Sequence, residues 1–474
     1  MAIDRALLHR ERVSTLLATA VLLVAGVSSA QDTHYWTQNY GTRGELLQGT
    51  VVGSIIDLSS VYYNPGTLAL QRNPAVILGT KAFELQTITL EDTKRGVEAP
   101  LESRSFGPAP TIFAGIFPPR WLDGQLAYSV LTRNDFDFRL EAVGSGTLAP
   151  ARADSIVLAG GEVFLDQNMT GVWGGPTWSR AWGKMGVGVT GFVAYHGQRT
   201  RSQLIVQGLR PSGEGAAATF IDNIDYWHFR LVFKAGVAWN YMPLTFGIAA
   251  TAPGVGLYGR GSALIDFFSV GFDIDNDGVR DTELIANFAD DLPADYKSPG
   301  SIAGGASYRY KKTTVHTSAE YFGSVDEYEV MPTQVFASPT TGEQYTQSTT
   351  LALDNVFNWG VGIEQHVIDW FKVYGSFITD NSAYVPGTST TVAVSNWDLK
   401  HVMGGAAFTF LDTDVTLGIG YSWGSERLRE IEHLQTDAEQ AGAPDLDVDA
   451  LLKYRKWNFI IGFAFGTPAV DSGR

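Results

Sequence analysis

Large apolar side chains alternate with small or polar ones in many segments of this chain. Segment 415–424 is typical, because Val415, Leu417, Ile419, Tyr421 and Trp423 share one face and glycine, threonine and serine form the other. Segments 457–466 and 229–240 repeat the pattern. A period of two indicates β-strands, and about ten residues is the length that a tilted strand needs to cross a bilayer. The pattern therefore predicts an all-β protein, a transmembrane antiparallel β-barrel.

The same alternation predicts about 14 strands within residues 75–466. Their expected ranges are 75–87, 109–117, 124–138, 156–180, 185–196, 226–240, 243–252, 300–310, 313–324, 355–366, 369–380, 398–410, 413–425 and 456–466. A count of twelve or sixteen strands is also compatible with the sequence, but the number should be even, as it is in bacterial barrels of this kind.

The connections between these strands differ in length on the two sides. Gaps after even-numbered strands are short, whereas 197–225, 253–299, 325–354 and 426–455 are long and polar. Short periplasmic turns and long extracellular loops are typical of outer-membrane barrels, and a soluble sandwich has no reason to alternate in this way. We also expect an aromatic girdle at the strand ends, formed by Trp239, Trp370, Trp397, Trp423 and Trp457.

Residues 1–30 have the form of a secretory signal peptide. A basic start with three arginines precedes an apolar stretch, and Ser28-Ser29-Ala30 supplies a small-residue cleavage site before Gln31. The alternative is an N-terminal membrane anchor, for which the apolar run is short. Residues 467–474 are expected to form a C-terminal periplasmic tail. The chain contains no cysteine, which excludes a lipoprotein anchor, disulfides and thiolate sites.

Charge and composition narrow the function further. The formal net charge is −16, and removal of three arginines with Asp4 and Glu11 makes the mature chain −17. Such an acidic protein is a poor nucleic-acid binder. We find no phosphate-binding glycine loop, zinc spacing or Gly-x-Ser-x-Gly elbow and expect no enzyme activity. The expected partners are outer-membrane lipid and a hydrophobic small molecule, bound by a monomer.

Residues 31–74 do not alternate and precede the first strand. They could form a plug threaded into the lumen or a disordered periplasmic tail. The element Asn64-Pro65-Gly66 favours a tight turn, because proline presets φ at the first central position and glycine accepts a positive φ at the second. This element could be a functional gate, or only the turn that leads into the first strand.

Segment 57–69, Asp-Leu-Ser-Ser-Val-Tyr-Tyr-Asn-Pro-Gly-Thr-Leu-Ala, resembles the N-terminal hatch of the FadL/TodX-like outer-membrane transporters of hydrophobic compounds. That family carries Asn-Pro-Ala where Gly66 stands here. Segments 299–310 and 358–380 resemble a strand and a hairpin of the same family. The resemblance implies a hatch over 31–74 followed by a fourteen-stranded barrel, and transport of compounds such as long-chain fatty acids.

The segment 273–281 has the spacing of a short calcium loop. Asp273, Asp275 and Asp277 precede a glycine, the Val279 carbonyl follows, and Asp281 stands at position nine. Calcium takes six to eight oxygen ligands, which such alternate positions can supply. The glutamate of a full EF-hand loop is missing, since Leu284 occupies position twelve. We expect a calcium ion in this extracellular loop; the alternative is an acidic solvated turn.

Several charged residues fall on strand faces that should point inward. These are Arg230, Lys234 and Arg309, with Glu320 and Glu364. They could pair with one another and with the N-terminal segment. Alternatively, the three cations could receive an anionic head group such as a fatty-acid carboxylate.

Two functions are compatible with these features. The first is passive transport of hydrophobic compounds through a hatch-gated barrel. The second is a structural or protein-secretion-associated barrel without solute transport. An apolar pocket inside the barrel with a wall opening beside the hatch would favour transport, whereas a solidly filled lumen would favour the second function.

Overall fold

The computed structural model describes the chain in eleven segments. These are residues 33–71, 75–92, 103–117, 123–147, 156–272, 280–332, 335–346, 349–385, 397–410, 413–428 and 450–466. The expected signal peptide, C-terminal tail and most of the expected calcium loop lie outside them. In the described part of the chain, no helix is long and apolar enough to cross a membrane.

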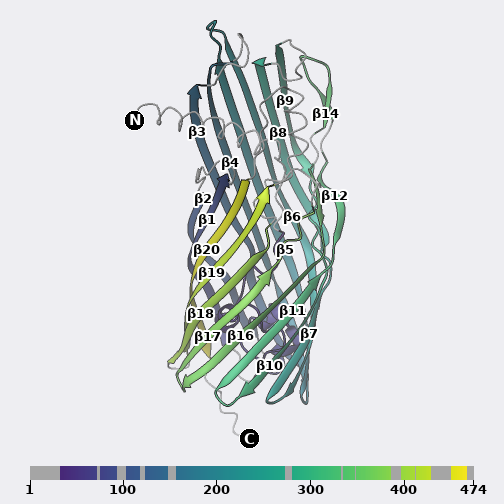
Figure 1. Ribbon diagram of the computed structural model, residues 1–474. Coiled ribbons are helices and arrows are strands. Elements are labelled where there is room, and N and C mark those ends of the chain that lie inside the picture. The colour runs from purple at the N-terminus through teal and green to yellow at the C-terminus, as the bar shows by residue number, and fades with distance from the viewer. Residues whose placement is uncertain are drawn as a thin grey trace, which may run out of the picture.

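Fourteen antiparallel strands close into a barrel, as the alternation predicts (Figure 1). β1 pairs with β20, and the additional pairing of β5 with β6 completes the ring. The barrel strands are β1 (Ala75–Asp92), β2 (Ser103–Phe117), β3 (Gln125–Thr147), β4 (Leu158–Trp182), β5 (Met185–Leu209), β6 (Gly215–Tyr241), β7 (Leu244–Thr251), β10 (Ser301–Tyr310), β11 (Thr313–Phe322), β16 (Val356–Ile368), β17 (Phe371–Asp380), β18 (Leu399–Phe410), β19 (Thr413–Leu428) and β20 (Ala450–Gly466).

The predicted register is confirmed by burial along the strands. Leu417 is 46% exposed on the outer face, whereas its neighbour Thr416 is fully buried. Aromatic side chains contact one another on the outer surface: Trp370 stacks with Phe408 at a strand end, and Tyr421 lies against Trp457 further along the wall. An outer face of large exposed apolar side chains is what a lipid-facing surface requires. Trp397 was wrongly placed in the girdle, because it is 1% exposed and packs inside against Tyr454.

The strands on one side of the barrel are much longer than a bilayer requires (Figure 1). The predicted loop 197–225 is wrong, because β5 and β6 stay paired up to Leu209 and Gly215. The predicted loop 253–299 contains β8 (Val255–Phe272) and β9 (Asp281–Pro293), which extend the wall from the upper part of β6. The predicted loop 325–354 contains two short pairs, β12 (Val325–Met331) with β15 (Thr349–Leu353) and β13 (Val335–Ala337) with β14 (Gln344–Thr346).

The ladder between β2 and β3 covers only part of the described strands. Pairing runs from Phe117–Leu126 to Ile112–Leu131. The described residues of β2 before Ile112 and of β3 after Leu131 do not pair with each other. On its other edge β3 stays paired with β4 up to Thr147, with a register shift between Thr132 and Asn134. The shift is a β-bulge at Arg133, which bends a strand locally. Above this bulge, no ladder hydrogen bonds therefore join the described residues of β2 and β3.

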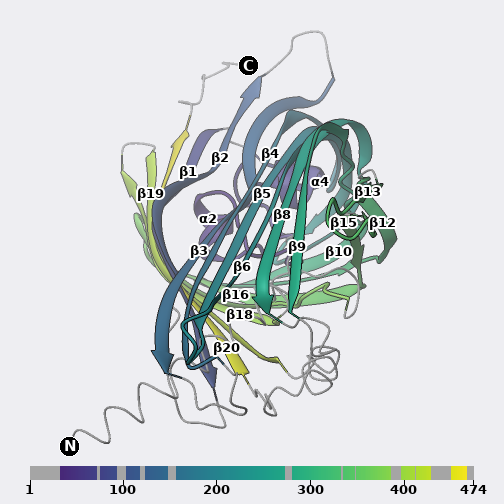
Figure 2. The ribbon, with the colours of Figure 1, turned by 90° about the horizontal axis from the view of Figure 1, so that it is seen from above.

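The N-terminal segment, residues 33–71, lies inside the ring of strands, where α2 and α4 are visible in the view from above (Figure 2). Its helices are short: α2 (Thr42–Leu46), α3 (Ser60–Tyr63) and α4 (Pro65–Leu68). Its apolar side chains join those of the inner wall in one buried cluster, in which Leu46, Leu58 and Val61 meet Ile112 and Leu131. Of the two sequence-based alternatives, the plug in the lumen is therefore the one that the structure has.

Candidate functional site

The Asn64-Pro65-Gly66 element fixes the N-terminal segment to the wall. Asn64 caps α4 by accepting a hydrogen bond from the Gly66 amide, and Pro65 occupies the first helical turn, where proline is tolerated. The Asn64 amide group donates to the carbonyl oxygens of Val52 (2.8 Å) and Val237 (3.1 Å). The element is thus a helix start bonded to β6. The Thr67 amide donates to the Asn64 carbonyl oxygen (3.0 Å) and closes a turn, but Gly66 does not adopt the positive φ that was predicted for it.

Gly66 does not adopt a positive φ. A glycine is required at this position because the backbone of α4 lies close to the wall. A Cβ on Gly66 would lie 2.7 Å from the Gly236 carbonyl oxygen and 2.8 Å from that of Gly186. On the opposing wall, a Cβ on Gly236 would collide with Oδ1 of Asn64. Glycines on both surfaces therefore let α4 pack backbone against backbone on β5 and β6, because no side chain separates them.

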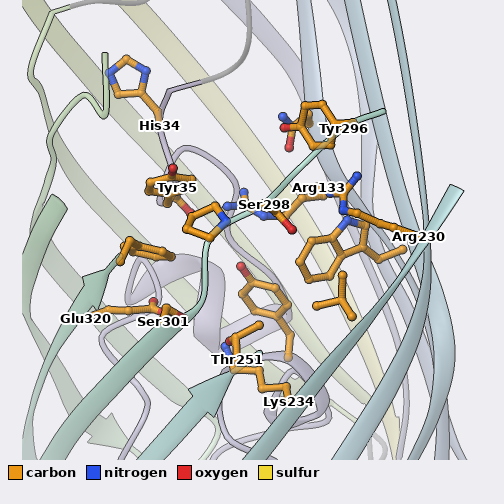
Figure 3. Close-up of a pocket in the computed structure, with 16 residues that line it drawn as sticks. His34, Tyr35, Arg133, Arg230, Lys234, Thr251, Tyr296, Ser298, Ser301 and Glu320 are labelled. Carbon is orange, nitrogen blue, oxygen red and sulfur yellow. The ribbon is translucent and has the colours of Figure 1, made fainter. Parts of the chain in front are cut away.

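A pocket with about 570 Å³ of empty space, which includes open solvent, lies between the N-terminal segment and the wall (Figure 3). A second pocket, with about 330 Å³ of empty space that again includes open solvent, adjoins it, since both are lined by Tyr35, Tyr62, Lys234 and Glu320. The walls combine aromatic rings with cations. The larger cavity is lined by His34, Tyr35, Tyr62, Arg133, Asn134, Trp173, Arg230, Val232, Lys234, Thr251, Tyr296, Ser298, Pro299, Ser301, Glu320 and Phe322.

Arg230 is held by aromatic faces and not by a carboxylate. It is 3% exposed, and its guanidinium lies 4.5 Å from the ring centre of Tyr296 and 5.9 Å from that of Trp173. Among the described residues, no group forms a hydrogen bond with Nε or Nη1 of Arg230. No carboxylate of these residues forms an ion pair with Arg230. A buried charge without a partner is costly, so the site favours an anion that can pair with Arg230.

Lys234 lies deeper in the lumen, four residues further along β6. It is 5% exposed, and its ammonium lies 4.7 Å from the ring centre of Tyr62. Burial raises the pKa of Tyr62, so its hydroxyl group stays protonated and can donate a hydrogen bond. Lys234 forms no ion pair with the described carboxylates, and Glu320 in the same cavity instead accepts from Trp36 Nε1 (2.9 Å) and Ser301 Oγ (2.6 Å).

The other predicted lumen charges lie elsewhere. Arg309 is on the inward face of β10 but is exposed near the β10–β11 turn, and it lines neither cavity. Glu364 is fully buried and pairs with Arg43 of the N-terminal segment, whose Nε lies 3.1 Å away. The structure therefore separates the predicted set: Arg230 and Lys234 face the cavity, whereas Glu364 holds the N-terminal segment.

A second carboxylate anchors the start of the N-terminal segment. Asp380 is fully buried, and it accepts hydrogen bonds from the Tyr35 and Trp36 amides (3.1 and 3.0 Å) and from Thr37 Oγ1 (3.0 Å). Asn358 Nδ2 donates to it as well, at 3.3 Å. The carboxylate therefore fixes residues 35–37 to the end of β17, beside the cavity lined by Tyr35.

Sequence reasoning missed most of the residues that line the cavity, and Arg133 and Tyr296 are two of them that contact other groups of the site. Arg133 donates from Nη2 to the Tyr35 carbonyl oxygen (2.9 Å) and lies over Trp173, but it sits at the bulge of β3, where counting by two fails. Tyr296 belongs to the non-strand segment 294–300, so no periodicity marks it. The charge of Arg133 directly after the apolar part of β3 was the available signal.

One Ser-His-Asp arrangement occurs among the described residues. Ser422 Oγ lies 2.6 Å from His401 Nδ1, and His401 Nε2 lies 3.7 Å from Asp380 Oδ2. All three side chains are buried, and Asp380 already accepts four hydrogen bonds. The serine lines neither cavity, so the group stabilises the wall and anchors the N-terminal segment.

The expected calcium site cannot be compared with the structure. Residues 273–279 lie outside the described segments, as does the side chain of Asp281. Among the side chains that are described, no group of three or more histidine, aspartate or glutamate residues is arranged to hold a metal ion.

Comparison with solved structures shows the same fold. A FadL homologue from Pseudomonas aeruginosa matches with a TM-score of 0.58 at 12% identity, over 91% of this chain and 99% of that one. The toluene transporter TbuX of Ralstonia pickettii matches with a TM-score of 0.54 at 10% identity, over 91% and 99%. The Pseudomonas putida toluene transporter TodX matches with 0.54 at 13%, over the same shares. No family model and no curated protein matches the sequence.

Proposed function

We propose that this chain is a passive transporter of the bacterial outer membrane for hydrophobic compounds that carry an anionic group, such as long-chain fatty acids. The observation that carries the proposal is the cavity in which Arg230 and Lys234 lie buried among aromatic rings without a paired carboxylate. An apolar chain gains from contact with the rings, and its head group gains a charge-assisted hydrogen bond. The likeness to a FadL homologue and to toluene transporters supports a hydrophobic substrate.

The route that we infer begins outside and ends in the wall. Substrate binds in the larger cavity, continues toward the smaller one beneath Tyr62, and leaves through the part of the wall where β2 and β3 are unpaired. The N-terminal segment touches this exit directly, since Tyr40 donates to the Thr132 carbonyl oxygen (3.1 Å) and the Tyr35 carbonyl accepts from Arg133. Movement of that segment would therefore act as the hatch.

A structural or secretion-associated barrel is the alternative function. A lumen filled solidly by its plug would favour it, but two adjoining cavities lie beside the N-terminal segment. An unpaired stretch of wall next to the plug also has no use in a purely structural barrel, because it sacrifices ladder hydrogen bonds. These two features favour transport.

Equilibrium binding of a long-chain fatty acid tests the proposal. Arg230→Gln with Lys234→Gln should weaken binding of the acid by roughly 10- to 100-fold, because charge-assisted hydrogen bonds are lost. Binding of the methyl ester should change much less. Arg199→Gln is the matched control, since Arg199 is exposed on the outer face and pairs with Asp225. An equal loss for acid and ester, or no binding of either by the unchanged protein, would contradict the proposal.

A further inference from the structure

The segment between β9 and β10 lies across the outer end of the cavity. Residues 294–300 form no strand, and Tyr296, Ser298 and Pro299 line the cavity from this segment. Tyr296 lies at the end of the cavity opposite Lys234, next to Arg230 (Figure 3). Since β6 runs inward from Gly215, Arg230 is nearer the outside than Lys234, and Tyr296 covers that outer end.

The ring of Tyr296 is held between two strands by stacking. On one side it stacks on the imidazole of His196 from β5, with ring centres 3.7 Å apart and an interplanar angle of 16°. The Arg230 guanidinium lies 4.5 Å from the same ring. The Arg230 guanidinium also lies 5.9 Å from the ring centre of Trp173. The side chains of His196, Tyr296, Arg230 and Trp173 therefore follow one another across the outer end of the cavity.

The segment is attached to several other elements by hydrogen bonds, among them one from Gly254 N to the Ser298 carbonyl (3.3 Å) and one from Gly323 N to the Gly300 carbonyl (2.9 Å). The Ala294 amide donates to the Gly259 carbonyl (3.2 Å), Asp295 N to the Val330 carbonyl (2.8 Å), and Lys297 N to Tyr328 Oη (3.0 Å). No paired ladder holds residues 294–300, unlike the strands on either side. Tyr296 is 6% exposed and belongs to a buried cluster with Tyr226 and Tyr328, so opening requires that this packing and the contact with Arg230 are both released.

We propose that Tyr296 is a specificity-determining gate, opened by substrates whose anionic group competes for Arg230. The inference rests on the proposed transport function and adds how the site selects its substrate. An anion that pairs with Arg230 satisfies the guanidinium better than the phenol face does, and it weakens the contact that keeps Tyr296 closed. A neutral hydrocarbon of the same size offers no such exchange and enters only when the ring moves spontaneously.

Association kinetics distinguish this gate from a passive wall. The probes are a dibrominated long-chain fatty acid and its methyl ester, which quench tryptophan fluorescence on contact, and Trp173 lies in the cavity. Subtracting the signal of a Trp173→Phe variant isolates this residue. The unchanged protein should bind the acid faster than the ester by roughly tenfold, the scale of one desolvated cation–π contact.

Substitutions at Tyr296 then give the decisive comparison. Tyr296→Ala should raise the association rate of the ester roughly tenfold and that of the acid much less, which abolishes the discrimination. Tyr296→Phe retains the ring and should behave like the unchanged protein. Retained equilibrium affinity of Tyr296→Ala for the acid will show that the cavity is intact.

Two results would overturn the gate. Acceleration of both probes by the same factor would make Tyr296 an obstacle without charge selectivity, and unchanged rates would show that it lies off the entry route. In both cases binding that depends on Arg230 would leave the transport proposal standing. Absence of quenching by either probe in the unchanged protein would instead refute both proposals.

Discussion

Replacement of Asp380 by alanine should release residues 35–37 from the wall and loosen the N-terminal segment. The buried carboxylate accepts four hydrogen bonds, and its removal leaves their donors without partners. We expect a loss of roughly 3–5 kcal/mol in local stability, the usual cost of breaking a buried charged network. Hydrogen exchange at the Tyr35 and Trp36 amides measures this loss directly.

The matched control is Asp354→Ala. Asp354 is exposed, and its backbone amide donates to the Ala383 carbonyl oxygen near the end of β17. Among the described residues, its side chain accepts hydrogen bonds only from Asn355. Its replacement should leave exchange at Tyr35 and Trp36 unchanged. Asp380→Asn should lie between the two, because the amide keeps one acceptor oxygen. Slow exchange at both amides in Asp380→Ala would show that other contacts hold the segment in place.

Replacement of Gly236 by valine should push α4 off the wall. Its Cβ would collide with Oδ1 of Asn64, and it would approach Pro65 Cδ to 3.0 Å. Overpacking of this kind costs about 1–3 kcal/mol, and the Asn64 side chain cannot move away without losing its hydrogen bonds to Val52, Val237 and Gly66. We expect a leak of small hydrophilic solutes through the barrel, measured by liposome swelling.

Gly404→Val is the control for this substitution. A Cβ on Gly404 meets no atom within 4 Å, so the added side chain lies in open space on the outer face. This variant should fold and remain as tight to small solutes as the unchanged protein. If the Gly236→Val variant does not leak small solutes, Asn64 can shift without displacing α4. The contact between Gly236 and Asn64 would then not be what closes the lumen.

The strands could be predicted from sequence where they cross lipid, and not where they leave it. Leu417 and its outward neighbours must be apolar, so the alternation is visible. Above the membrane the outer face of β5 and β6 meets water, where Arg199 pairs with Asp225, and the buried inner face carries polar side chains such as Thr200. Without an apolar face a strand has no period of two in hydrophobicity, which is why 197–225 was predicted to be a loop.

The site was predictable in part for a similar reason. Strand parity alone places Arg230 and Lys234 in the lumen, since β6 alternates without a bulge over these residues. Arg133 follows a register shift, and Tyr296 lies in a segment without periodic structure. Gly66 was assigned to a turn because proline and glycine favour one, but its packing against β5 and β6 depends on contacts that are distant in sequence.

A reversible lock on the N-terminal segment tests the central claim most directly. Ser54 and His316 are bonded across the gap between segment and wall, with Ser54 Oγ 2.8 Å from His316 Nδ1. Because the chain has no cysteine, Ser54→Cys with His316→Cys creates a single possible disulfide, whose formation mass spectrometry verifies. In liposomes, the oxidised protein should bind a long-chain fatty acid but not transport it, and reduction should restore transport. Equal transport before and after reduction would contradict the account, because substrate would then pass without any movement of the hatch.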